Sequence, residues 1–240
     1  MIKTVSIDFW NTIVIAETGG EKRHKVRLEA LNSLASQYDV TITEKAIATA
    51  KKKVSKEFDK VWFGEQRTLT SHDLVKRIVE ILKIPAKKSE IDETTTVFME
   101  SLWVGPPAPA DGVIDNIKKL AENYRLAIIS DTMFSPGRVL RKYLDDIGIL
   151  DGFDVTVFSD ETGYSKPDIR AYQKVMKETN TASENSVHIG DIHKTDIIGA
   201  QQAGWKSILY TGVSDEYKDT SDADKIIDSW DDIPGAIADL

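Results

Sequence analysis

The second half of the chain alternates helical patterns with short apolar segments, and this alternation most narrowly limits what the chain can fold into. The helical patterns carry apolar residues at a spacing of three or four. Apolar strands that alternate with helices are typical of a parallel sheet covered by helices on both faces. We therefore expect a doubly wound α/β fold, whose first strand is the apolar segment at 3–8. The later strands are expected at 126–130, 154–158, 186–190, 206–210 and 225–228.

Residues 21–103 interrupt this alternation, because their apolar side chains recur at helical spacing and no convincing strand lies among them. A stiff, proline-rich connector with the sequence GPPAPADG follows at 105–112. We therefore expect two domains. Residues 1–16 and 106–240 would form the α/β core, and residues 17–105 would form an α-helical cap domain inserted after the first strand.

Composition excludes several classes of protein. The chain has 240 residues, no cysteine and a formal net charge of −8. Without cysteine it has no disulfide framework, thiolate nucleophile or Cys-ligated metal centre. The acidic balance argues against a nucleic-acid partner. No apolar run approaches the roughly 20 residues of a membrane helix, and the N-terminus lacks a signal-peptide pattern, so we expect a cytoplasmic protein without a membrane partner.

Polar and charged side chains follow the predicted strands at their carboxyl ends. Parallel α/β sheets bind their ligands at this edge, outside the carboxyl ends of the strands. Because these strand ends lie side by side, we expect residues that are far apart in the sequence to converge there. The residues are Asp8 after the first strand, Ser130 and Asp131 after the second, Lys166 in the loop after the third, and Asp191 and Asp196 after the fourth.

These residue types predict a site for a metal ion and a phosphoryl group. Asp8, Asp191 and Asp196 would place three carboxylates close together, where repulsion raises a pKa unless a cation intervenes. Mg²⁺ prefers such hard oxygen ligands. Ser130 can donate a hydrogen bond and Lys166 can bring positive charge to an anionic oxygen. A phosphoryl group held in this way would lie in line for attack by Asp8.

The chain resembles the haloacid dehalogenase (HAD) superfamily, whose four motifs it matches in order and over nearly its whole length. The helical insert resembles the C1 cap of that superfamily, and the core would then be Rossmann-like. The resemblance implies that Asp8 is the nucleophile, that Mg²⁺ is the cofactor and that the cap selects a small phosphorylated substrate. The matching residues are Asp8 and Thr12, Ser130, Lys166, and the Gly-Asp-x4-Asp of Gly190, Asp191 and Asp196.

The resemblance also implies a role for each residue of the site. Asp8, Asp191, Asp196 and the backbone carbonyl of Trp10 would bind or support the metal. Asp8 and Lys166 would be catalytic. The phosphoryl group would be held by Ser130, Asp131, Lys166, Asn11 and Thr12.

Trp10 departs from the pattern, because phosphatases of this family usually carry there a second Asp that protonates the leaving group. Indole has no usable acid–base function, and losing a positioned acid–base costs on the order of 10²–10⁴ in rate. Three explanations stay open. The protein is a phosphatase with an acidic leaving group or another proton source, a 2-haloacid dehalogenase-like or phosphonatase-like hydrolase, or a binder of phosphorylated ligands with weak or no turnover. Asp191 and Asp196 favour the phosphatase, since family dehalogenases do not use Mg²⁺.

Some of these residues have a purely structural alternative. Asp131 is favoured as the cap of a helix that begins near Pro136, and Asp196 can cap a helix beginning at Ile197. His188 is expected to pack within its strand rather than to bind a ligand. A basic run at the start of the cap is usually a solvated helix face, although it can also meet an anionic substrate. This run comprises Lys22, Arg23, His24, Lys25 and Arg27.

Overall fold

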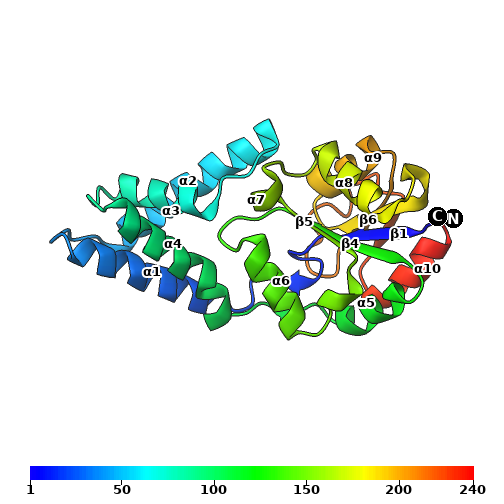
Figure 1. Ribbon diagram of the computed structural model, residues 1–240, viewed down its shortest axis with the longest axis horizontal. Coiled ribbons are helices and arrows are strands. Elements are labelled where there is room, and N and C mark those ends of the chain that lie inside the picture. The colour runs from blue at the N-terminus through cyan, green and yellow to red at the C-terminus, as the bar shows by residue number, and fades with distance from the viewer.

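The computed structural model describes residues 1–240, and at its centre lies a six-stranded sheet with the order β5-β4-β1-β6-β7-β8. All neighbouring strands in it are parallel. Helices cover both faces of this sheet (Figure 1), which confirms the doubly wound α/β fold. The strands are β1 (Thr4–Ile7), β4 (Arg125–Ser130), β5 (Val155–Phe158), β6 (Ser186–Gly190), β7 (Lys206–Tyr210) and β8 (Lys225–Ile227).

The core helices lie in two layers. In Figure 1, α8 and α9 cover one face of the sheet, and α5, α6 and α10 cover the other. Local sequence sets their ends: Asp168 caps α8 by accepting the Arg170 amide at 2.9 Å, and Asn180 ends the helix with a φ of 52°. The core helices are α5 (Val113–Ala121), α6 (Gly137–Asp146), α7 (Ser159–Thr162), α8 (Ile169–Thr179), α9 (Ile198–Gln202) and α10 (Ile233–Ala238), with short turns η1 (Leu150–Gly152), η2 (Ser183–Asn185), η3 (His193–Ile197) and η4 (Trp230–Asp232).

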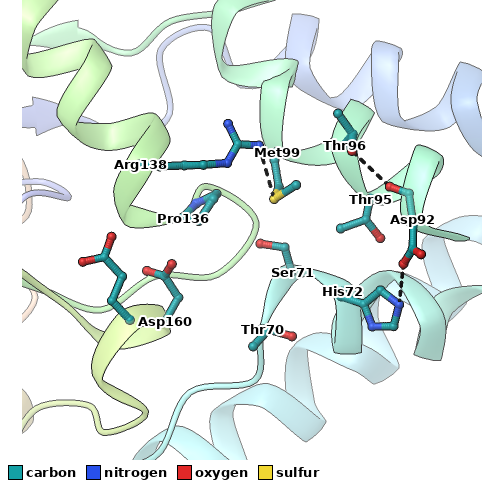
Figure 2. A pocket seen from close by; sticks show the side chains of 11 residues that line it. Thr70, Ser71, His72, Asp92, Thr95, Thr96, Met99, Pro136, Arg138 and Asp160 are labelled. Carbon is teal, nitrogen blue, oxygen red and sulfur yellow. Dashed lines mark hydrogen bonds and ion pairs between the residues drawn. The ribbon is translucent and has the colours of Figure 1, made fainter.

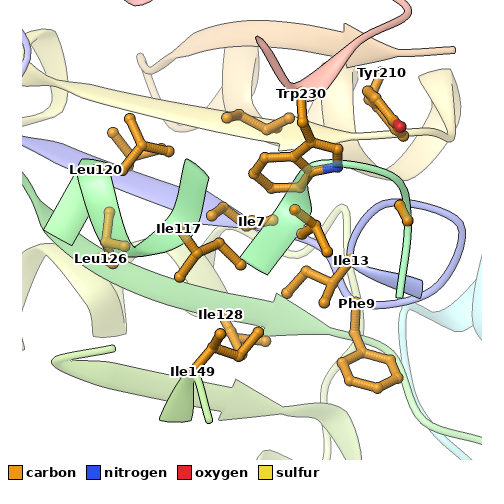
Figure 3. Close-up of a cluster of buried hydrophobic side chains, with 14 of the residues drawn as sticks. Ile7, Phe9, Ile13, Ile117, Leu120, Leu126, Ile128, Ile149, Tyr210 and Trp230 are labelled. Atoms are coloured by element: carbon orange, nitrogen blue, oxygen red, sulfur yellow. The ribbon is translucent and has the colours of Figure 1, made fainter. Parts of the chain in front are cut away.

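One apolar cluster joins the central strands to the helices of one face (Figure 3). Ile7 of β1 and Ile128 of β4 are fully buried in it beside Ile117 of α5. Each such side chain contributes roughly 1.5–3 kcal/mol. Trp230 is also fully buried, and its indole N–H donates to the carbonyl of Thr12 at 3.0 Å. The C-terminal segment therefore fixes the loop that follows β1.

The inserted segment is helical throughout and carries its own apolar cluster, which confirms the predicted α-helical insert. It forms a separate lobe at one end of the sheet (Figure 1). The third helix begins with a capping box in which Thr70 and Asp73 bond to each other's backbone amides, so the cap residue is Thr70, whereas the sequence pattern suggests Ser71. The cap helices are α1 (Gly20–Ser36), α2 (Glu44–Glu65), α3 (Ser71–Ile81) and α4 (Lys88–Val104). None of the helices has the length and apolar character that crossing a membrane requires.

The two chain segments that connect the core to the cap lie side by side in close contact. The strands β2 (Val14–Ile15) and β3 (Ala108–Pro109) form a small antiparallel pair there. Gly19 has a φ of 71°, and a Cβ on it would lie 2.3 Å from the carbonyl oxygen of Gly105. Arg23 donates to the carbonyls of Thr18 and Gly105 and so ties both connections together. The domain boundaries after residues 16 and 105 stay a prediction.

Candidate active site

The strand-end residues meet at the carboxyl edge of the sheet around β1. This strand lies between β4 and β6 and is parallel to both. Asp8 directly follows β1, Ser130 is the last residue of β4, and Asp191 directly follows β6. All three are buried, with exposed fractions of 6%, 1% and 5%. The fold therefore brings these predicted residues to one place, at the point where the strand order reverses.

Lys166 reaches this place from the loop after α7 and lies between two carboxylates. Its ammonium group donates to Oδ1 of Asp8 and to Oδ1 of Asp196, both at 2.6 Å. Burial opposes its charge, but the carboxylates of Asp196 and Asp8 outweigh that effect and hold the pKa of Lys166 well above its usual value. The residue is therefore a fixed positive charge beside the candidate nucleophile.

Asp196 lies in η3, a single π-helical turn, and its carboxylate is saturated by the protein. Oδ1 also faces Nε2 of His188 at 3.0 Å, and Oδ2 accepts the amide of Ile192 at 2.9 Å. Burial works against ionisation, yet Lys166 and His188 hold the pKa of Asp196 below its usual value. A Cβ on Gly190 would lie 2.3 Å from Asp196 Cγ, which explains the glycine of this motif.

The carboxylate of Asp196 thus binds an amide that precedes it in the chain. The alternative that it caps a helix starting at Ile197 is wrong, because Asp196 lies inside the turn His193–Ile197 and the next helix, α9, begins at Ile198. A residue held in this way orients its neighbours and has little capacity left for a metal ion.

His188 is a positioning residue that the strand pattern does not reveal. It is fully buried in β6, opposite Ser6 of β1, and its Nδ1 lies 2.6 Å from the Ser6 hydroxyl. Burial lowers the pKa of His188, so the ring is neutral. With one ring proton, the network is satisfied when Ser6 donates to Nδ1 and Nε2–H donates to Asp196. The sequence signal that could have revealed this role is a histidine in the middle of a predicted strand.

Asp191 lacks the partners that Asp196 has. Burial, followed by the charges of Asp8 and Asp196, raises its pKa well above the usual value, and only Lys166 and the nearby Asn11 amide oppose this. Burial also raises the pKa of Asp8 to about 6, although Lys166 lowers it. Two buried carboxylates are therefore only partly compensated at this edge, and this is the arrangement that a divalent cation would relieve.

The donor set fits magnesium better than a metal held by many side chains. No group of three or more His, Cys, Asp or Glu side chains is arranged to hold a metal ion. Mg²⁺ usually takes only one or two protein carboxylates and completes its shell with water and substrate phosphate. Asp8 and Asp191 supply the carboxylates. The carbonyl of Trp10 accepts no backbone hydrogen bond and so keeps its oxygen for a further ligand contact.

Two hydroxyl groups at this edge are buried without a hydrogen-bond partner, namely those of Ser130 and Thr12. Buried hydroxyls are normally paired, so each needs an explanation. An anionic oxygen bound beside Asp8 would supply one. Asn11 shapes the same loop: it has a φ of 52°, and its side-chain oxygen accepts the Ala16 amide at 3.2 Å.

Asp131 does not cap α6, so the favoured structural alternative is wrong. Asp160 takes that role by accepting the Gly137 amide at 3.0 Å. Asp131 instead accepts the indole N–H of Trp62 at 2.9 Å and the amide of Lys166 at 3.1 Å. Burial raises its pKa to about 7, although Lys166 and Trp62 lower it. Asp131 therefore joins Trp62 of the cap to the loop of the core that carries Lys166.

A cavity of about 350 Å³ lies beside these residues, between cap and core. Trp10 forms part of its wall, with its ring edge-on to Phe9 at a centroid distance of 5.0 Å. Trp62 and Asp131 line it as well, and so do Arg23 and Arg27 of the cap. The side chain that replaces the usual second Asp is thus a wall of the cavity that a substrate would enter.

A second cavity, of about 470 Å³, lies between α3, α4 and the start of α6 (Figure 2). Nε2 of His72 lies 3.0 Å from Oδ1 of Asp92 on one side of it, and Arg138 and Asp160 lie on the other. None of the strand-end residues lines this cavity. It is therefore separate from the candidate active site.

Related proteins share parts of this sequence. The glyceraldehyde 3-phosphate phosphatase of Methanothermobacter thermautotrophicus is 35% identical over 91 residues, which are 37% of this chain and 38% of that protein. The pyrophosphatase PpaX of Halalkalibacterium halodurans is 28% identical over 128 residues, 52% of this chain and 58% of that protein. The matched segments therefore cover less than two thirds of these relatives.

Solved structures share the fold over the full chain. The 2-haloacid dehalogenase of Pseudomonas syringae pv. Tomato DC3000 superposes with a TM-score of 0.77 at 19% identity, covering 100% of this chain and 99% of that one. A predicted phosphoglycolate phosphatase of Haemophilus somnus 129PT gives 0.63 at 17% identity, with coverages of 98% and 97%. At such identities the likeness concerns the fold, cap included.

The family comparison extends over most of the sequence. The model of the haloacid dehalogenase-like hydrolases matches residues 11–210, a range that includes the second, third and fourth motifs. Asp8, the candidate nucleophile, lies just ahead of this range, at the end of the strand that the fold places at its centre. The chain belongs to the haloacid dehalogenase-like hydrolase family.

Proposed function

We propose that the protein is a Mg²⁺-dependent phosphatase that hydrolyses a small organic phosphate through an aspartyl-phosphate intermediate on Asp8. One observation carries the proposal: Lys166 donates to both Asp8 and Asp196, whereas the buried Asp191 carboxylate is only partly compensated by Lys166 and Asn11. Such an arrangement suits a nucleophile that shares its site with a cation and an anion.

The residues divide the reaction between them. A carboxylate oxygen of Asp8 attacks phosphorus, an Asp8–phosphorus bond forms, and the bond from phosphorus to the leaving oxygen breaks with its electron pair. Water then attacks the same phosphorus, inorganic phosphate leaves and the Asp8 carboxylate is restored. Lys166 and the hydroxyls of Ser130 and Thr12 stabilise the negative charge of the phosphoryl oxygens in both steps.

Asp8, Asp191 and the Trp10 carbonyl would hold the magnesium ion, which when bound supplies positive charge for the phosphoryl group. We assign Asp196 a positioning role, because its oxygens are engaged by Lys166, His188 and Ile192. It keeps the Lys166 ammonium next to Asp8 and keeps the loop after β6 in place.

Trp10 limits which leaving groups are efficient. The indole donates no proton to the leaving oxygen, so that oxygen departs as an anion or takes its proton from water. We therefore expect phosphate esters of acidic alcohols or phenols to react faster than esters of ordinary alcohols.

A 2-haloacid dehalogenase-like reaction is the second candidate, and the aromatic residue at position 10 favours it, since a halide leaves without protonation. A dehalogenase-like reaction would, however, give the buried Asp191 carboxylate no chemical role. A phosphonatase-like reaction and phosphorylated-ligand binding without turnover are further outcomes that the experiment separates.

The experiment measures phosphate release from a panel of phosphomonoesters with Mg²⁺ and with a chelator, and halide release from 2-chloropropionate. Phosphate release that requires Mg²⁺ supports the phosphatase. Halide release without metal and no phosphate release would replace it by the dehalogenase. Ligand binding with neither product would leave a binding protein. The cytoplasmic location stays a prediction.

A further inference from the structure

The basic run at the start of the cap divides into two faces of α1. Lys22, His24 and Lys25 are exposed, as expected of a solvated helix face. Arg23 is buried, and Arg27, one turn further along, is partly buried; both line the cavity that also contains Trp10. The sequence pattern alone does not make this division, because it depends on how α1 packs against α4 and the core.

The two guanidinium groups are partnered by neutral groups. Arg23 donates to the carbonyls of Ala16, Thr18 and Gly105. Arg27 uses only its Nε, which donates to the Ser101 hydroxyl at 2.9 Å, and its Nη groups make no hydrogen bond to the protein.

Aromatic rings complete the surroundings of Arg27. Its guanidinium carbon lies 4.8 Å from the centre of the Phe134 ring and 5.6 Å from that of Phe98. Burial, followed by the charge of Arg23, lowers the pKa of Arg27 to about 10. Buried charges are normally paired with an opposite charge. Two neighbouring arginines that keep their charge without one are typical of an anion-binding site.

The surroundings add further positive charge on the same side. Lys51 of α2 lies 2.7 Å from the His24 ring, and burial and the charge of Arg27 both lower the pKa of Lys51. The acids of the cavity are Asp59, which is exposed, and Asp131, which is occupied by Trp62 and Lys166. Neither pairs with the arginines.

The cavity adjoins the candidate active site, and Asp131 is the strand-end residue that lines it. Trp10, two residues beyond the nucleophile, forms its wall, and Asp131 contributes from the loop after β4. Its volume of about 350 Å³ is at the lower end of the range for small-molecule sites. A substrate whose phosphoryl group lies at Asp8 would therefore extend its remaining part along Trp10 towards Arg27.

We propose that Arg27, supported by the charge of Arg23, binds a second anionic group of the substrate, so that the enzyme acts on small phosphate monoesters that carry another carboxylate or phosphate. This inference rests on the proposed phosphatase function. Arg27 makes the direct contact with its free Nη groups. Arg23 adds positive charge and holds the two connections between core and cap together through its three carbonyl contacts.

The test compares matched substrates in Mg²⁺. Comparing 2-phosphoglycolate with ethyl phosphate measures the effect of a carboxylate on the substrate. Comparing propane-1,3-diyl bisphosphate with propyl phosphate measures the effect of a second phosphate. The measured quantity is the ratio of kcat/KM within each pair. We expect the wild type to prefer the partner that carries the second anionic group in at least one pair, and that pair identifies the group. Arg27→Met should lower this ratio about 10- to 100-fold, as expected for a hydrogen-bonded charge, and Arg27→Lys should keep part of it.

Lys25→Met is the matched control, because it removes the same charge from an exposed position of the same helix. It should leave the ratio within about twofold. If Arg27→Met and the control give the same ratio as the wild type, the inference is wrong even when phosphate release is confirmed.

A binding measurement decides the matter independently of turnover. In an Asp8→Asn background, calorimetry with Mg²⁺ should show tighter binding of 2-phosphoglycolate or the bisphosphate than of the partner that lacks the second anionic group, and Arg27→Met should abolish that difference. If no phosphomonoester is hydrolysed but this difference persists, the phosphatase proposal fails and the anion site stands. Equal affinities for both members of each pair would overturn the site. Near-ultraviolet circular dichroism checks that each variant is folded.

Discussion

The core and the cap each bury charge where they face each other, but the buried charges are of opposite sign. The core edge holds Asp8, Asp191 and Asp196 around one ammonium group, that of Lys166. The cap side presents Arg23 and Arg27, whose partners are carbonyls, a hydroxyl and aromatic rings. The carboxylates of the core edge therefore lack sufficient positive charge, and the two arginines of the cap lack a negatively charged partner.

This difference separates chemistry from selection. A cation and a phosphoryl group would complete the core edge, whereas an anion would complete the cap side. The two halves meet through the bond from Trp62 to Asp131 and through the crossing of Gly19 and Gly105. Substitutions at the core edge should therefore change mainly kcat, whereas substitutions of the cap arginines should change mainly the preference between substrates.

The sharpest test of the core is Asp8→Asn. The amide is a poor nucleophile, so we expect kcat to fall by about 10⁴-fold or more. Binding of 2-phosphoglycolate should persist, since the cap residues are unchanged. Phosphate release by this variant at more than a tenth of the wild-type rate would mean that Asp8 does not form the intermediate.

Lys166→Met should have the next largest effect. It leaves the carboxylates of Asp8 and Asp196 buried without their common partner, so we expect a loss of about 10³-fold in kcat and about 3 kcal/mol in the free energy of unfolding measured with urea. Lys174→Met is the control, because its partner Glu178 is at the surface, and such pairs contribute less than about 1 kcal/mol. Equal losses in both variants would contradict a special role for Lys166.

Trp10→Asp tests whether the missing acid–base residue beside the nucleophile limits the reaction. A carboxyl group at this position can protonate the leaving oxygen, so kcat on alkyl phosphates should rise about 10- to 100-fold. Trp10→Phe, which keeps an aromatic ring and adds no acid, should give no rise. A folded Trp10→Asp variant that binds Mg²⁺ without any gain would show that proton transfer does not limit the reaction.

The smallest expected effect concerns Asp131, where cap and core are joined. Its pKa in the folded protein, about 7, lies above the usual 3.8, so the folded state binds more protons than the unfolded state between these values. Its ionisation therefore lowers stability as pH rises from about 4 to 7, and the full loss is present above 7. Asp131→Asn does not titrate.

The free energy of unfolding of Asp131→Asn, relative to wild type, should therefore increase between pH 5 and pH 8 by on the order of 1 kcal/mol. Urea unfolding at several pH values measures it. The exposed Asp219→Asn serves as the control and should show no such trend. A difference that decreases with pH would mean that the Asp131 carboxylate is stabilised in its ionised form.

Most of the fold could be predicted from the spacing of apolar residues along whole helices and strands. The strands β6 and β7 lie at the predicted residues 186–190 and 206–210, because apolar residues bounded by polar turns mark a buried strand. The strands β2 and β3 were missed, since two-residue strands have no periodicity. The N-cap residue of α3 is Thr70, one residue before the Ser71 that the sequence pattern suggests. Both are suitable N-cap residues, and only the bond to Asp73 distinguishes them.

The family, the α/β sheet with its helical insert, and the acids and the lysine at the strand ends could all be predicted from the amino-acid sequence. Local propensity and motif spacing are enough for these, because they depend on residues near one another in the chain. Three further features follow only from the folded arrangement: Asp196 has more hydrogen-bond partners than Asp191, His188 supports Asp196, and Arg23 and Arg27 turn inward while Lys22 and Lys25 do not. Burial and hydrogen bonding between distant segments set these differences, and neither is encoded in the spacing of residues along the chain.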